Sequence, residues 1–180
     1  MMLFRHFHRG PNEKYFKGPV YSSTVPALQR IYVDTSVIGG CEDPEFTEWS
    51  TLLFNDFRKG SRIAVVSDLT LRELELAPDT VRIILDTVPS RAFEYADLSE
   101  QAEALAHRYL DEGVVGEKHV VDAQHIAIAT IRKVDVLVSW NFQQMVNLGR
   151  ILRFNMVNTA MGYPELEIRS PREVVHGEEI

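Results

Sequence analysis

Four residues that could supply oxygen ligands stand close to the apolar runs of this sequence. Asp34, Glu73 and Asn141 each follow a short apolar run, and Asp122 opens the helical pattern that leads into the last of these runs. Mg²⁺ and Mn²⁺ prefer oxygen ligands and are often held by one or two carboxylates together with a substrate phosphate. Carboxylates gathered in one cleft repel one another unless a cation is present. If the chain brings these residues together, the chemistry is that of a divalent metal ion.

The elements that must position these residues follow from the periodicity of the apolar side chains. Short β-like runs at 31–33, 63–66, 91–95 and 134–139 predict strands, and a last strand is expected from Ile151 onward. Helical spacing predicts helices over 43–59, 68–77, 79–85, 98–109 and 121–132, with a short one at 142–148. Asp43 and Pro44 would open the first of these helices as N-cap and first helical residue.

Strands that alternate with helices indicate parallel βαβ units. We therefore expect the α/β class, as a three-layer α/β/α sandwich with a central parallel sheet. In such a sheet ligands bind outside the carboxyl ends of the strands. The four polar residues should consequently meet at one edge of the sheet.

Each acid also has an ordinary structural interpretation. Asp34 could be a turn residue or a helix cap, Asp122 could be an N-cap, and Glu73 could be a solvated helix charge. Any one of them alone favours that interpretation, and their joint placement at one sheet edge favours a site.

Four further residues are candidates for supporting roles around the acids. Ser36 and Ser139 lie beside two strand ends, together with Asn141. His125 follows Asp122 by one helical turn and could contact a carboxylate, although a core histidine with satisfied ring nitrogens is the commoner case. Trp140 could stack on a nucleobase or simply pack in the core.

The first 29 residues differ from the rest of the chain. Prolines and glycines interrupt every periodic segment there, so we expect an irregular N-terminal extension over 1–29 and one domain over 30–180. The extension carries four basic residues against one acid, a balance of +3, so the total charge of −7 leaves −10 on the domain. An acidic body does not attract a polyanion at long range, and any nucleic-acid contact must come from a local cation or metal.

With these residues in place, the chain resembles the PIN-domain family, and within it the VapC-type toxin ribonucleases. Each matching segment is weak alone, but their order and spacing over residues 30 to about 160 make the match specific. The segments are Ile31-Tyr32-Val33-Asp34-Thr35-Ser36, Ser67-Asp68-Leu69-Thr70-Leu71-Arg72-Glu73-Leu74, Asp122-Ala123-Gln124-His125-Ile126-Ala127 and Leu137-Val138-Ser139-Trp140-Asn141-Phe142.

The resemblance implies an Mg²⁺- or Mn²⁺-dependent endoribonuclease (a hydrolase) that cleaves RNA phosphodiester bonds as the toxin of a toxin–antitoxin pair. By the match, Asp34, Glu73 and Asp122 are the catalytic and metal-binding acids. Asn141 stands where many members carry a further Asp, which leaves a second metal position open. The alternative is a catalytically inactive PIN fold that serves as an RNA- or protein-binding module.

Two other classes of protein that carry an aspartate after a strand fit this sequence less well. A haloacid-dehalogenase-like phosphatase needs a second Asp two residues after the first, where this chain has Ser36. A response-regulator receiver needs an acidic pair and a late lysine, and neither is evident.

Location and partners follow from the same data. One cysteine, Cys41, excludes an intrachain disulfide, and no apolar run suggests a secretion signal or a membrane span, so we expect a cytoplasmic protein. The apolar helices around 46–57 and 98–109 suggest a homodimer or, with the family resemblance, a cognate antitoxin as partner.

Overall fold

The computed structural model describes residues 27–176, so residues 1–26 of the expected extension lie outside the described part. Five strands form one parallel sheet with the order β3-β2-β1-β4-β5. The elements in chain order are β1 (Arg30–Val33), α1 (Thr35–Gly39), α2 (Thr47–Lys59), β2 (Ile63–Ser67), α3 (Asp68–Leu74), α4 (Asp79–Asp86), β3 (Phe93–Ala96), α5 (Glu100–Asp111), α6 (Val120–Ile131), β4 (Val136–Val138), α7 (Leu148–Ala160), β5 (Ile168–Arg169) and α8 (Pro171–His176).

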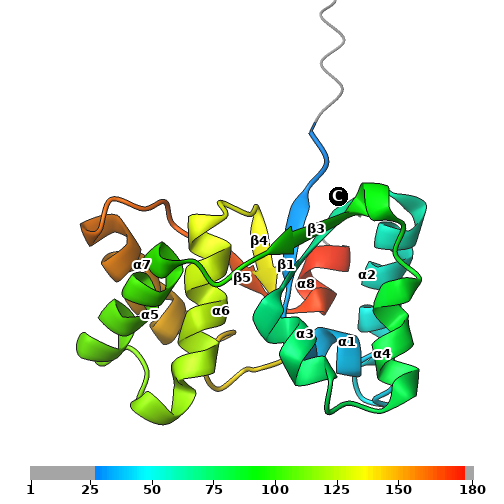
Figure 1. The fold of residues 1–180 in the computed structure, drawn as a ribbon, viewed down its shortest axis with the longest axis horizontal. Helices are drawn as coiled ribbons and strands as arrows, with labels where there is room; N and C mark the ends of the chain where they lie inside the picture. Colours follow the sequence, from blue (N-terminus) through cyan, green and yellow to red (C-terminus); the bar gives the residue numbers. More distant parts are fainter. Residues whose placement is uncertain (1–26, 177–180) are drawn as a thin grey trace, which may run out of the picture.

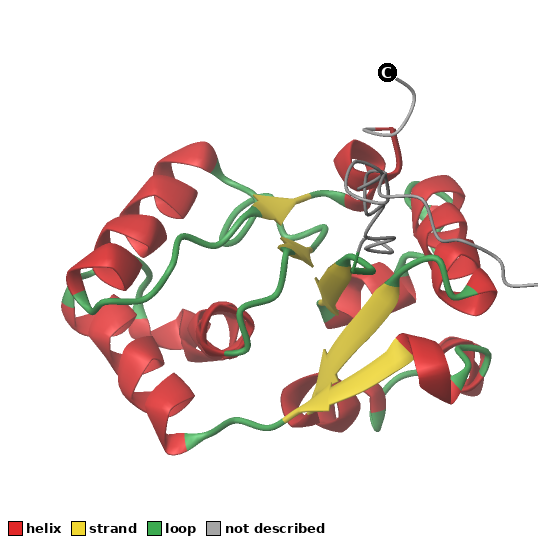
Figure 2. Ribbon diagram, turned by 90° about the horizontal axis from the view of Figure 1, so that it is seen from above, coloured by secondary structure: helices red, strands yellow, loops and turns green. Residues whose placement is uncertain are grey.

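Helices cover both faces of the sheet, as Figures 1 and 2 show. Side chains alternate along β1, so Tyr32 points to one face while Ile31 and Val33 point to the other. The Tyr32 face packs against α5, α6 and α7. The opposite face packs against α1, α2, α4 and α8. The predicted three-layer α/β/α sandwich is confirmed.

β1 lies in the middle of the sheet and fixes the site by its position. It pairs with β2 on one side and with β4 on the other, so three strand ends meet side by side. The backbone NH of Asp34 donates to Val138 O at 3.1 Å, which joins the ends of β1 and β4. The carboxyl ends of these strands point toward α1 and α3 (Figure 1).

The helices near residue 40 differ from the sequence prediction in two ways. The helix predicted from Asp43 begins only at Thr47, because Asp43 instead closes a turn in which its Oδ1 accepts from the Glu45 NH at 2.8 Å. The short helix α1 was not predicted, since five residues are too few to display a helical period.

The region after β4 also differs from the expectation. Residues 142–147 form turns rather than a helix, and the strand expected from Ile151 is the interior of α7. The Asn147 side chain caps this helix by accepting from the Arg150 NH at 3.2 Å, and Phe154 and Val157 are buried one turn apart. The last strand is β5, whose two residues are too few to show an alternating pattern.

In the described part of the chain, no helix has both the length and the apolar character needed to cross a membrane.

Candidate functional site

Asp34 is a buried carboxylate at the end of β1. As N-cap of α1, its Oδ2 accepts hydrogen bonds from the Ser36 hydroxyl and, at 2.8 Å, from the Ser139 hydroxyl. Its Oδ1 faces His125 Nε2 at 4.0 Å. Asp34 is therefore a helix cap and also presents one carboxylate oxygen toward the other candidate residues.

His125 lies between two of the predicted acids. Its side chain is 1% exposed, and Nε2 lies 3.3 Å from Glu73 Oε2. On the other side of the ring, Nδ1 lies 2.7 Å from the Tyr32 hydroxyl, which donates to Ser67 Oγ at 2.7 Å. Both sequence interpretations hold at once, since His125 is a core histidine with satisfied ring nitrogens and also contacts a carboxylate.

The electrostatics of this pair reflect burial and close charges. Burial lowers the pKa of His125, but the hydrogen bond with Glu73 and the charges of Asp34, Glu73 and Asp122 outweigh it, so the pKa is raised. Burial raises the pKa of Glu73, but the hydrogen bonds with His125 and from the Thr35 hydroxyl outweigh it, so the pKa is lowered. The two shifts together favour a charged imidazolium–carboxylate pair.

Asp122 stands one helical turn before His125 at the start of α6. Its Oδ1 accepts from Asn141 Nδ2 at 3.1 Å, and its Oδ2 lies 3.1 Å from His119 Nδ1. Burial and the nearby charge of Asp34 raise the pKa of Asp122. A cation bound between Asp34 and Asp122 would offset the charge that raises the pKa of Asp122.

Asn141 and Ser139 connect the acids from the strand end of β4. Ser139 Oγ donates to Asp34 and accepts from the Asn141 NH at 2.9 Å. The Asn141 amide oxygen accepts from the Gln144 NH at 3.0 Å, so its NH₂ group is the part that faces Asp122. Ser36 completes this edge, because its hydroxyl also accepts from the Trp140 NH at 3.0 Å.

Among the described residues, three side chains that could ligate a metal come together: Asp34, Glu73 and His125. One ligand atom from each lies within 4.8 Å of the others. The two carboxylates of this set are ligands of the type that Mg²⁺ and Mn²⁺ prefer, whereas His125, as the charged partner of Glu73, orients that carboxylate and does not itself bind the ion. Asp122 lies next to the group with Asn141 rather than within it.

Sequence reasoning missed three contributors. Tyr32 orients His125, Thr35 holds Glu73, and His119 contacts Asp122. A usable pattern existed only for His119, because it precedes Asp122 by three residues and therefore lies on the same helical face.

Two other residues considered in the sequence have structural positions. The Trp140 ring packs on Phe46, with centroids 4.5 Å apart, and its Nε1 donates to Ser50 Oγ at 2.9 Å. Burial raises the pKa of Cys41 to about 11, which keeps this thiol protonated and unreactive.

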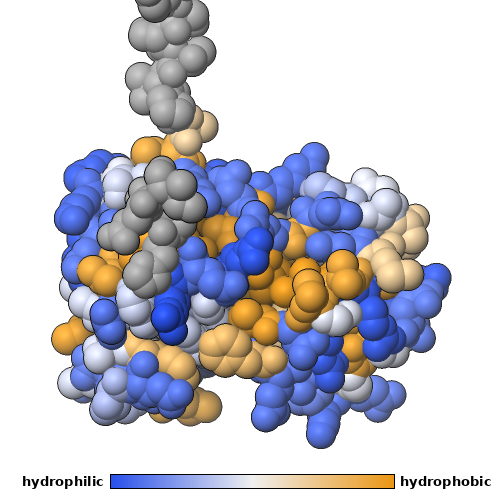
Figure 3. Space-filling model, turned by 180° about the vertical axis from the view of Figure 1, so that it is seen from behind, coloured by the Kyte–Doolittle hydropathy of each residue, from blue (hydrophilic) through white to orange (hydrophobic). Residues whose placement is uncertain are grey.

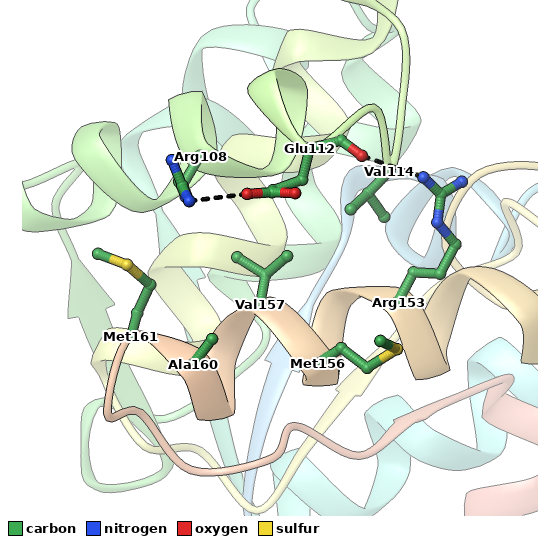
Figure 4. Close-up of a pocket in the computed structure, with 8 residues that line it drawn as sticks. All are labelled: Arg108, Glu112, Val114, Arg153, Met156, Val157, Ala160 and Met161. Atoms are coloured by element: carbon green, nitrogen blue, oxygen red, sulfur yellow. Dashed lines mark hydrogen bonds and ion pairs between the residues drawn. The ribbon is translucent and has the colours of Figure 1, made fainter.

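A cavity lies between α5 and α7, away from the carboxylates. It has a volume of about 310 Å³, and Figure 4 shows its lining, with Met156, Val157 and Ala160 on α7, Met161 just after it, and Arg108, Glu112 and Val114 on the other side. Arg153 closes one end of it by donating to the Gly113 carbonyl at 2.7 Å. None of the candidate site residues lines this cavity.

Comparison with known proteins finds similarity in structure only. No protein-family model matches the sequence, and no curated protein matches it either. The fold is similar to that of VapBC2 from Rickettsia felis, solved with a DNA fragment from its promoter, at a TM-score of 0.51 and 15% identity over 79% of this chain and 98% of that one. It is also similar to FitAcB from Neisseria gonorrhoeae, at a TM-score of 0.50 and 14% identity over 79% and 98% of the two chains.

Proposed function

We propose that this chain, which has a VapC-type PIN-domain fold, is an endoribonuclease that depends on Mg²⁺ or Mn²⁺. The observation that carries the proposal is the convergence of Asp34, Glu73 and His125 at the carboxyl edge of the sheet, with Asp122 beside them. A phosphodiester is an anion, and a cluster of acids is compatible with it only when cations offset their charge.

In this proposal each residue has its own task. Asp34, Glu73 and Asp122 hold the ion through carboxylate oxygens. The Ser36 and Ser139 hydroxyls fix Asp34 so that its Oδ1 faces the shared space.

The other two acids are also held by neighbours. His125 and Thr35 orient Glu73. Asn141 and His119 orient Asp122. A bound Mg²⁺ or Mn²⁺ would lower the pKa of an attacking water and offset charge on the leaving oxygen.

A protein partner forms part of the same proposal. The similar structures are of VapBC2 and FitAcB, and they motivate a cognate antitoxin for this chain as well, with a homodimer as the other assembly. The helix faces suggested by the sequence are mostly used in the core, since Leu53, Phe57 and Tyr109 are buried. Exposed apolar side chains instead form a stripe on α7: Leu148, Leu152 and Met156. Figure 3 shows hydrophobic surface gathered on this side of the molecule.

The competing function is an inactive PIN fold that binds RNA or protein. It is favoured by one observation, which is that Asn141 adds a neutral amide where a fourth carboxylate would add charge. It predicts RNA binding without cleavage and without specific uptake of Mn²⁺.

Calorimetric titration with Mn²⁺ combined with an RNA cleavage assay tests the proposal. Wild-type protein should bind Mn²⁺ and cleave RNA, and EDTA should abolish cleavage. Asp34→Asn should lose both properties and keep its circular dichroism spectrum, because it removes the charge of Asp34 without removing its hydrogen-bonding shape. Asp86→Asn is the matched control, since this exposed acid lies on α4. Cleavage by Asp34→Asn at the wild-type rate would refute the site assignment.

A further inference from the structure

A cleft of about 610 Å³ lies on the side of the sheet that packs against α2 and α8. It is formed by residues at the N-terminal ends of α2 and α8 and by the segment that follows β4. Four aromatic side chains line it: Phe46, Trp49, Trp140 and Phe142. This is a dense collection of rings for a surface cavity, and the reaction proposed above does not use them.

The cleft and the carboxylates share one stretch of backbone. Ser139 donates to Asp34, Trp140 donates through its NH to Ser36, and Asn141 donates to Asp122. The Trp140 ring, which belongs to the middle residue of the three, lines the cleft. The cleft and the carboxylates therefore flank the same three-residue segment of the chain.

The rings form a supported surface. Phe46 and Trp140 stack with an interplanar angle of 23°. The Trp140 ring is fixed by its hydrogen bond to Ser50. A Cβ at position 40 would lie 2.8 Å from the ring Nε1, so only glycine fits against the ring at Gly40. Phe142 stands 6.0 Å from Trp140 by ring centroids and is 49% exposed. The cleft thus presents an accessible ring beside a rigid one.

Polar groups surround the rings. The Arg172 guanidinium carbon lies 5.6 Å from the centroid of the Trp49 ring, and Ser170, Glu45 and Glu173 complete the rim. Ring faces with polar groups at the edge suit a flat, polar heterocycle better than an aliphatic side chain. A nucleobase is such a group, and every base offers a π-face.

The charge of the protein gives an independent reason for a contact of this kind. With a net charge of −7, the chain gains nothing from long-range attraction to RNA. Affinity for a single strand must then come from local contacts, and base stacking on aromatic side chains supplies it without regard to net charge.

We propose that this cleft binds an unstacked nucleobase of single-stranded RNA, adjacent to the phosphate held at the carboxylates. The inference rests on the proposed ribonuclease function for the identity of its ligand. Phe142 provides the exposed stacking face, Trp140 supports it, and Arg172 is placed to meet a neighbouring phosphate.

Tryptophan fluorescence tests the proposal directly, because the two tryptophans of the chain, Trp49 and Trp140, both line the cleft. A short single-stranded RNA is titrated into full-length protein in the presence of EDTA, so binding is observed without cleavage. The matched titration uses an oligonucleotide of the same length that lacks bases. We expect saturable quenching by the RNA and at least tenfold weaker binding of the abasic strand.

Substitutions locate the contact. Phe142→Leu keeps an apolar side chain but removes the ring, and it should weaken RNA binding about tenfold, whereas Phe142→Tyr should bind like wild type. Tyr95→Leu is the control, because Tyr95 is 51% exposed but lies on β3 at the opposite edge of the sheet from β5. Equal melting temperatures for these variants exclude unfolding as the cause.

The outcomes separate the two proposals. Equal binding of the RNA and the abasic strand, or equal binding by wild type and Phe142→Leu, overturns the nucleobase cleft even if RNA is cleaved. Base-dependent quenching that Phe142→Leu removes supports the cleft even if no RNA is cleaved, and in that case only the ribonuclease proposal fails. Quenching by an apolar peptide but not by RNA assigns the cleft to a protein and overturns the inference.

Discussion

The side-chain amide of Asn141 forms hydrogen bonds through both its oxygen and its nitrogen. The oxygen accepts from the Gln144 NH and the nitrogen donates to Asp122, so this side chain stabilises Asp122 as a carboxylate. An aspartate at this position would keep the acceptor for Gln144 but would place a negative charge against Asp122. The identity of residue 141 therefore controls how much charge the site carries.

We expect Asn141→Asp to bind Mn²⁺ more tightly than wild type and to melt at a lower temperature without metal. Divalent-ion affinity rises with the number of charged ligands, and a fourth carboxylate increases repulsion in the empty cleft. Calorimetry measures the first effect, and thermal unfolding in EDTA measures the second. If neither quantity changes, residue 141 lies outside the site and the three acids act without it.

The site could be predicted only as far as its residues carry distinctive types at strand ends. Asp34 and Asp122 are conspicuous in the sequence because acids interrupt apolar patterns there. Tyr32 is not, because a tyrosine in a buried strand is an ordinary core residue, and only the fold shows that its hydroxyl contacts His125. Thr35 likewise needs the fold, since its partner Glu73 is 38 residues away.

At the scale of elements, the sequence predicts long amphipathic helices and buried strands well. The strand and helix expected around β2 and α3 are confirmed, and the Ser67 hydroxyl caps this helix by accepting from the Thr70 NH. We expected a strand where α7 lies. Three apolar side chains of this helix are exposed, and together with the buried ones they hide the helical period in the sequence. Tertiary contacts of Phe154 and Val157 decide the helical form there.

The cap of α7 can be tested by itself. Asn147→Ala should lower the free energy of unfolding by about 1 kcal/mol, because the Arg150 NH loses its acceptor. Asn147→Asp should retain most of the stability, since its carboxylate can still accept. Urea unfolding followed by circular dichroism gives both values, and equal stability of all three proteins would mean that the cap contributes nothing.

An ion pair connects two strands across the sheet. Arg30 on β1 donates to Glu94 on β3, with Nη2 and Oε2 2.7 Å apart, and these hydrogen bonds lower the pKa of Glu94. A lowered carboxyl pKa stabilises the fold above the unfolded value of about 4.3, and this stabilisation is lost as the pH falls through the folded pKa.

Glu94→Gln should therefore cost about 0.5 kcal/mol at pH 7, a small effect because both side chains are partly exposed. The difference from wild type should shrink as the pH is lowered toward 3. Urea unfolding at several pH values measures it, and Glu48→Gln, an exposed acid on α2, is the control. A difference that grows on acidification would contradict the assigned direction.

At the scale of the whole molecule, the apolar stripe on α7 is the surface on which we expect a partner. Leu148, Leu152 and Met156 recur every four residues, and Met156 also lines the cavity between α5 and α7. Light scattering should give a mass above the 20.6 kDa of one chain, either from a second copy or from a small co-purifying protein.

Leu152→Lys should return the mass to that of a single chain, because it places a charge in the middle of the stripe. Ile83→Lys is the matched control, since Ile83 is 57% exposed on α4 and Leu152 is 58% exposed. A monomeric wild type that purifies from its native host without a small protein would contradict the assignment of this surface.

The central place of β1 also determines when the site can exist during synthesis. β1 leaves the ribosome early, but its partner β4 and the Ser139 that fixes Asp34 follow 105 residues later. Contacts so distant in sequence form late, after local helices and the β1–β2 pair. A growing chain consequently carries Asp34 and Glu73 before it carries Ser139 and Asn141, and the centre is not yet assembled at that stage. The order of the strands therefore delays assembly of the centre until the residues that follow β4 have been synthesised.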